Sequence, residues 1–177
     1  MKLKLIFNVI FICMIYSETN DISDVKVTLN IQETPELRQW GEIAQQLSIE
    51  WLPRITNLLS SKGFTAPDHI ELKLKKSEEG IAGTDGTKIE VSSHWIEKHP
   101  DDLGMIVHEV THVVQCYPNF EPGWVTEGVA DYIRWGLYES KPLDWYPLND
   151  KPKGYQDGYR VTAGFFLWLE SDLAPGI

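Results

Sequence analysis

The segment HEVTHVVQCYPNFEPGWVTEGVADY, residues 108–132, holds two histidines and four carboxylates in a chain with only five histidines. His108 and His112 are four residues apart, so on a helix both side chains project from one face, about one turn from each other. Two imidazoles at this spacing can bind the same tetrahedral zinc ion. Glu109 then lies beside the metal, where it can accept a proton from a bound water. The pattern predicts a metal site with a general base.

This five-residue pattern also arises by chance, because histidines on helices are commonly surface or capping residues. The sequence that follows strengthens the prediction. Fourteen residues separate Glu127 from His112, and Glu127 can supply a third ligand from a facing helix, which leaves the fourth position to water. Asp131 lies four residues further on and can hydrogen-bond the far nitrogen of a ligand histidine, fixing its tautomer.

Two helices must position these residues. The segment Asp101–Cys116 is predicted to be the first helix, with an acidic start and one apolar stripe opposite the histidines. Residues 124–132 form the second predicted helix, which the turn at Pro122-Gly123 brings back over the first. Gln115 is expected on the polar face of the first helix.

The first half of the chain is predicted to be rich in strands. Residues Val25–Ile31 and Ile70–Lys76 alternate apolar and polar side chains, which is the period of half-buried strands. The pair Asp85-Gly86 is a hairpin turn signal between the short stretch Ile81–Thr84 and a strand over Thr87–Ser92.

Further helices are predicted on both sides of this region. Thr34-Pro35 is typical of a helix start, and Pro53 should kink or restart that helix. Residues 141–158 are rich in proline and glycine and predict a long loop before a last helix over Tyr159–Leu173. Strands followed by helices predict an α+β fold whose C-terminal part is mainly helical.

The length of 177 residues predicts one domain. Its first 17 residues have two lysines followed by an apolar run that is too short to span a membrane, which predicts a secretory signal peptide. The mature domain would then be residues 18–177, in the extracellular space or the periplasm, with no stable membrane association. An uncleaved membrane anchor is the alternative.

Removing residues 1–17 takes away two lysines and no acid, so the formal charge changes from −10 to −12. Such an acidic domain makes nucleic acid an improbable partner. Cys116 would be the one cysteine of the mature chain, which excludes an internal disulfide. We expect it to be a small buried apolar residue.

The motifs HEVTHVVQ and W-x-x-EGVADY resemble those of gluzincins, the zinc peptidases with a glutamate ligand, and more narrowly the plant basic secretory protein family and its bacterial relatives. The resemblance includes IAGTDGTKIEVSSHWI and GYQDGYRVTAGFFLWL and covers most of the chain from about Trp40. It implies a zincin-like fold in which a small twisted mixed sheet packs on the active-site helix. It also implies one zinc ion held by His108, His112 and Glu127, with Glu109 as base. The family continues past the end of this sequence, which leaves open whether these 177 residues are a fragment.

The expected reaction is the hydrolysis of peptide bonds in peptides or proteins. Glu109 would take a proton from the attacking water and pass it to the leaving amine. Tyr159 is the first candidate for stabilising the oxyanion, and Tyr155 is the second. An extended substrate would pair with the sheet edge at Ile81–Thr84.

Two other functions are compatible with the sequence. In a non-catalytic secreted binding module the zinc ion could serve only to stabilise the fold, although such a structural site has no use for Glu109 as a base. A zinc aminopeptidase would need an acid near the edge strand to bind the free amine of its substrate. Asp85 is the candidate for that role, but a glycine-rich exopeptidase motif is missing.

Overall fold

The structure is a computed structural model that describes residues 25–59, 61–117 and 120–173. The predicted signal peptide, residues 1–17, lies outside the described residues. Among the described residues, no helix has both the length and the apolar character that a membrane span requires.

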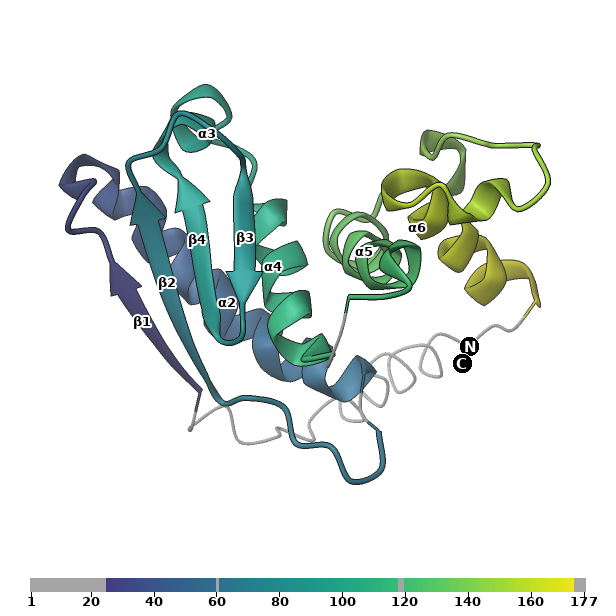
Figure 1. The fold of residues 1–177 in the computed structure, drawn as a ribbon, viewed down its shortest axis with the longest axis horizontal. Coiled ribbons are helices and arrows are strands. Elements are labelled where there is room, and N and C mark those ends of the chain that lie inside the picture. Colours follow the sequence, from purple (N-terminus) through teal and green to yellow (C-terminus); the bar gives the residue numbers. More distant parts are fainter. Residues whose placement is uncertain (1–24, 60, 118–119, 174–177) are drawn as a thin grey trace, which may run out of the picture.

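A four-stranded mixed sheet forms one layer of the molecule (Figure 1). Its strands are β1 (Lys26–Asn30), β2 (His69–Lys75), β3 (Ala82–Asp85) and β4 (Lys88–Ser92). They lie in the order β1-β2-β4-β3. The pairs β1/β2 and β2/β4 are parallel, whereas β3 pairs antiparallel with β4. The predicted strands and mixed sheet are confirmed, and β3 forms one edge.

The hairpin between β3 and β4 follows from its turn residues. Asp85 pairs with Lys88, so Gly86 and Thr87 form a two-residue loop. Gly86 has φ 59°, a left-handed value that glycine adopts without a steric penalty. This loop returns the chain so that β3 takes the outer position.

Two helices, α2 (Arg38–Leu58) and α4 (Gly104–Gln115), cover one face of the sheet (Figure 1). Buried side chains from alternate positions of β2 and β4 face them across the core: Ile70, Leu72, Leu74, Ile89 and Val91. Burying such aliphatic side chains contributes roughly 1.5–3 kcal/mol each. The helix carrying the two histidines is therefore fixed on a rigid base.

Helix boundaries differ from the predictions in two places. The first helix begins with a 3-10 turn, η2 (Pro35–Leu37), and α2 then continues through Pro53 without a restart. The histidine helix begins at Gly104, and Asp102 precedes it. The carboxylate of Asp102 instead accepts hydrogen bonds from Trp95 and Arg134. A short helix, α3 (Ser93–Lys98), follows β4 and was not predicted.

The C-terminal part is helical, as predicted. Helix α5 (Gly123–Asp131) runs into a π-helix, η3 (Tyr132–Tyr138). Two 3-10 turns, η4 (Leu143–Trp145) and η5 (Gly154–Gln156), interrupt the predicted loop before α6 (Tyr159–Trp168), which ends in a second π-helix, η6 (Leu169–Leu173).

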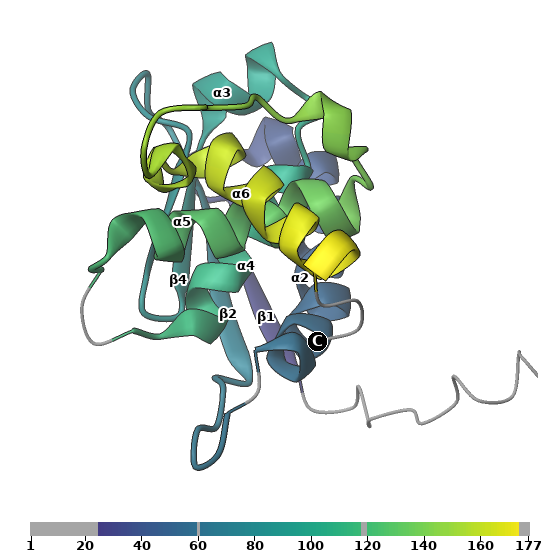
Figure 2. The same ribbon diagram turned by 90° about the vertical axis from the view of Figure 1, so that its right-hand side faces the viewer.

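Helix α5 packs against α4, and α6 packs closely against α5 (Figures 1 and 2). Gly128 permits this approach, because a Cβ at its position would overlap the side chain of Thr162 on α6. The glycine of the EGVADY motif therefore has a packing role. It sets the position of α5, which carries Glu127 and Asp131.

The expectation that Cys116 is buried is wrong. Its side chain is exposed, and the residue caps the C-terminus of α4 with a left-handed φ of 39°. Because the helix ends here, Cys116 leaves the apolar stripe that buries Val110 and Val114. It lies at the wall of the cavity described below.

Candidate metal centre

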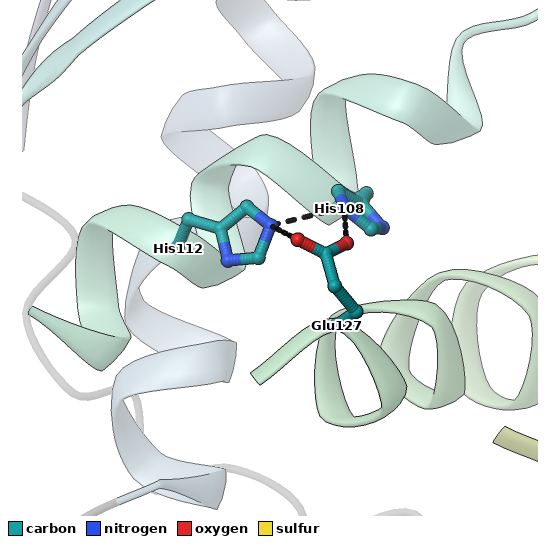
Figure 3. A group of neighbouring side chains, drawn as sticks. All are labelled: His108, His112 and Glu127. Carbon is teal, nitrogen blue, oxygen red and sulfur yellow. Dashed lines mark hydrogen bonds and ion pairs between the residues drawn. The ribbon is translucent and has the colours of Figure 1, made fainter. Parts of the chain in front are cut away.

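Three side chains of ligand type converge between α4 and α5 (Figure 3). His108 and His112 project from α4, and Glu127 meets them from α5. Nε2 of His108 is 3.2 Å from one carboxylate oxygen of Glu127, and Nε2 of His112 is 3.7 Å from the other. One ligand atom from each residue can be chosen so that all three lie within 4.8 Å of one another. The three residues form a possible metal-binding triad.

The far nitrogen of His108 is held by Asp131. Nδ1 of His108 donates to Oδ1 of Asp131 over 2.7 Å, because a carboxylate can only accept. Asp131 follows Glu127 by one helical turn, and its side chain is 2% exposed. The contact fixes the tautomer of His108 and directs its Nε2 lone pair toward Glu127.

The far nitrogen of His112 has a different partner. Nδ1 of His112 donates to the side-chain oxygen of Gln115 over 2.8 Å. The amide nitrogen of Gln115 donates to the main-chain oxygen of Thr126 over 2.9 Å, so the orientation of the amide is determined. Gln115 lies on the same helix face as His112, as expected, but the residue is buried and holds His112, which was not predicted.

The chemistry of this donor set favours a cation. With both Nδ1 atoms donating, the two neutral rings direct Nε2 lone pairs at each other across 3.0 Å, next to the carboxylate of Glu127. Two such acceptors repel unless a proton or a metal ion lies between them. Two nitrogen ligands of tetrahedral zinc lie roughly 3.3 Å apart, given bond lengths of about 2.0–2.1 Å. The residues therefore fit a zinc ion.

In the metal-free site a proton provides the positive charge. Burial by itself would lower the pKa of His108, but hydrogen bonds to Asp131 and Glu127 outweigh it and raise that pKa to about 9. Partial burial would raise the pKa of Glu127, but the hydrogen bond and charge of His108, with the charge of His112, lower it. A metal ion and this proton would therefore compete for the same position.

Glu109 lies next to the triad but does not belong to it. Its side chain is 7% exposed and still reaches the cavity in front of the histidines. The hydroxyl of Thr84, on strand β3, donates to its Oε2 atom over 2.7 Å. Glu109 is therefore positioned as a carboxylate beside the site and outside the cluster of ligand atoms.

A cavity of about 690 Å³ opens on the triad. Strand β3 forms one wall and η3 contributes Arg134 and Trp135 to another. Tyr159 lines this cavity, whereas Tyr155 lines a separate apolar pocket and stacks on Phe165. Asp85 does not belong to the cavity wall.

Tyr159 has an unusual backbone. Its φ is 46° at the first residue of α6, a conformation that costs energy for a large side chain. Its ring is largely exposed. The negative charge of Glu127, followed by partial burial, raises the pKa of the phenol. Tyr159 therefore stays protonated at neutral pH and can donate a hydrogen bond.

The fold and site together define a mixed α/β protein with a possible metal-binding triad, a buried carboxylate beside it and an open cavity. The chain belongs to the BSP family, described as a peptidase of plants and bacteria, whose family model matches residues 37–177. This membership confirms the resemblance noted in the sequence. Comparisons with curated proteins and with solved structures found no match.

Two residues of the site were not predicted from the sequence. Gln115 lies three residues after His112, a spacing that places the two side chains together on a helix and could have indicated the contact. Thr84 is 25 residues from Glu109, and only the fold brings them together. Both residues hold a neighbouring side chain by hydrogen bonds.

Proposed function

We propose that the protein is a secreted, zinc-dependent endopeptidase with a zincin-like fold. The observation that carries this proposal is the convergence of His108, His112 and Glu127 at a cavity that also contains Glu109. Three protein ligands leave one position for water, which is the arrangement of catalytic zinc sites. Membership of a peptidase family supports a peptide or protein substrate.

The three ligand residues would hold the ion, with Asp131 and Gln115 orienting the two imidazoles. Zinc, when bound, would lower the pKa of a water molecule and polarise the substrate carbonyl. Glu109 is the proposed general base: its carboxylate would accept the proton of that water and return it to the leaving amine. Its position outside the triad supports this role.

An extended substrate would pair with the free edge of β3, which lines the cavity. Tyr159 would donate a hydrogen bond to the oxygen that becomes negative in the transition state. Its place in the cavity supports Tyr159 over Tyr155, which lines a separate pocket. The phenol can make this contact without carrying charge itself.

We further propose that residues 1–17 are a signal peptide and that residues 18–177 form the mature domain. The apolar run after two lysines supports secretion. The formal charge of −12 after cleavage disfavours nucleic acid as a partner.

The competing functions find less support. A structural zinc site would need neither the cavity nor a buried carboxylate beside the ligands. An aminopeptidase would need an acid that reaches the substrate amine, and Asp85 lies outside the cavity wall. Endopeptidase activity is therefore the function that the site favours.

The test combines metal analysis of the purified mature chain with cleavage of a denatured protein mixture. We expect about one zinc per chain, cleavage in zinc, loss of cleavage in a chelator and recovery on adding zinc back. Folded protein that binds zinc but cuts nothing would favour the binding module. Cleavage that continues unchanged without metal would contradict the zinc mechanism.

A further inference from the structure

The edge strand makes a specific contact with the proposed base. Oγ1 of Thr84 lies 2.7 Å from Oε2 of Glu109 and 3.1 Å from the main-chain oxygen of the same residue. The hydroxyl has one proton to donate, and the shorter distance and the negative charge favour the carboxylate. Within the described residues, Thr84 is the hydrogen-bond partner found for this carboxylate.

The main chain of Thr84 faces the opposite way from β4. The amide of Ser92 donates to the main-chain oxygen of Ile81, and these two residues extend the register by one step beyond the Ala82–Val91 pair, so they are a hydrogen-bonded pair. Hydrogen-bonded and non-hydrogen-bonded pairs alternate in an antiparallel ladder. The pair Thr84–Ile89 is therefore non-hydrogen-bonded, and the N–H and C=O groups of Thr84 point to the free edge of the sheet.

One residue thus connects the edge that would receive a substrate with the proposed base. We propose that Thr84 is a positioning residue for Glu109. Its backbone groups would pair with the substrate strand, while its hydroxyl holds one oxygen of the carboxylate and leaves the other free for the proton of the attacking water. This inference rests on the proposed function, because it gives Glu109 the role of general base.

The hydrogen bond from Thr84 would restrain the side chain of Glu109, which could otherwise take other rotamers. Glu109 is nearly buried, and its side chain has rotatable bonds that the helix leaves free. Proton transfer requires the base within hydrogen-bond reach of the water, and small displacements reduce the rate strongly. A hydroxyl fixed on a strand can hold the carboxylate without adding charge. The main-chain oxygen of Glu109 gives that hydroxyl a second acceptor when the carboxylate becomes protonated.

Thr84→Val tests this role, because valine keeps the shape and β-branching of threonine and removes the hydroxyl. We expect kcat to fall roughly ten- to a hundredfold with KM nearly unchanged, since substrate pairing uses the backbone. Thr84→Ser restores the hydroxyl and should recover most of kcat. Thr87→Val is the matched control: it removes a hydroxyl from the same hairpin, one that contacts His69, and should leave kcat unchanged.

A second measurement does not depend on activity. In the metal-free protein, Thr84→Val leaves the Glu109 carboxylate without its donor and should lower Tm. In a Glu109→Ala background the same change should lower Tm less, which is the signature of direct coupling. Zinc stoichiometry should stay the same in Thr84→Val, because no ligand or ligand partner is removed.

The possible failures are distinguishable. A wild-type protein that binds zinc and cleaves nothing contradicts the proposed function. An active wild type with an equally active Thr84→Val variant contradicts only the positioning role. A rise in KM at unchanged kcat also overturns it, since Thr84 would then be a substrate contact alone. Additive Tm changes for Thr84→Val and Glu109→Ala would show that the two side chains are not coupled.

Discussion

Gln115 accepts a hydrogen bond from Nδ1 of His112 at 2.8 Å, and its amide group connects His112 to the backbone of α5. The amide nitrogen donates to the main-chain oxygen of Thr126, the residue before Glu127. Gln115 therefore joins α4 to α5 beside two residues of the possible metal-binding triad. Removing the Gln115 side chain should therefore change both the orientation of the His112 imidazole and the distance between α4 and α5.

Gln115→Leu should weaken zinc binding roughly tenfold or more, because it keeps the size of the side chain and removes both contacts. Competition with a chelator of known affinity measures the change. Gln115→Glu separates the two contacts, since a carboxylate can accept from His112 but cannot donate to Thr126. Gln39→Leu, at an exposed position of α2, is the control and should have no effect. Equal zinc affinity in all variants would show that Gln115 does not support the ligand.

Asp131→Ala should weaken zinc affinity or activity by roughly ten- to a hundredfold, since it removes the partner of His108 but no ligand. Asp131→Asn keeps an acceptor oxygen without the charge and should have a smaller effect. Zinc affinity from chelator competition and a folded circular dichroism spectrum check both statements. If neither variant differs from wild type, Asp131 does not orient the ligand.

Tyr159→Phe should lower kcat and leave KM nearly unchanged, because the lost hydrogen bond would form mainly in the transition state. A tenfold to hundredfold loss is the expected order of magnitude. Tyr155→Phe is the matched control: this tyrosine stacks on Phe165 outside the central cavity, and its kcat should stay near wild type. The reverse result would assign the oxyanion contact to Tyr155.

Much of the site could be read from the sequence because its determinants are local. The i, i+4 spacing of His108 and His112 fixes a common helix face, and the same spacing relates Glu127 to Asp131. The contact of Asp131 with His108 was anticipated because ligand histidines usually have such partners. The fold class could be predicted because apolar residues recur with the period of strands in much of the first half of the chain and with the period of helices in the second half.

The other features of the site depend on how the helices and strands pack against one another. The contact between Thr84 and Glu109 requires β3 to lie against α4, and neither residue carries a signal of the other. Cysteine is a residue type that is commonly buried, yet the position of Cys116 at the end of α4 exposes it. The π-helix that begins at Tyr132 had no recognisable cue, although it brings Trp135 to the cavity.

Gly128→Ala should lower the free energy of unfolding by about 1–3 kcal/mol, because the new methyl group overlaps Thr162 across the α5/α6 contact. Adding Thr162→Ser removes the nearest methyl group and should recover part of the loss. Gly83→Ala, where a Cβ meets open space, is the control. Urea unfolding measures all three. Stability equal to wild type in Gly128→Ala would show that α6 can move away from α5 without cost.

Glu109→Gln separates an enzyme from a structural zinc protein. Glutamine keeps the size and helix propensity of glutamate and can still accept a hydrogen bond from Thr84, but it lacks the basic oxygen. We therefore expect zinc to remain bound and the fold to stay intact. Peptide cleavage should fall at least about a hundredfold, the usual scale for the loss of a general base. Metal analysis, Tm and cleavage of a broad peptide library measure the three properties.

Each alternative outcome of Glu109→Gln identifies a different error. If the variant loses zinc, Glu109 is a ligand, and the assignment of Glu127 as the third ligand is wrong. If wild type and variant both bind zinc but neither cleaves the library, the zinc site is structural, and the protein is better described as a binding module. If cleavage stays at the wild-type rate, another group accepts the proton, and the hydrogen bond from Thr84 then serves only to satisfy a buried carboxylate.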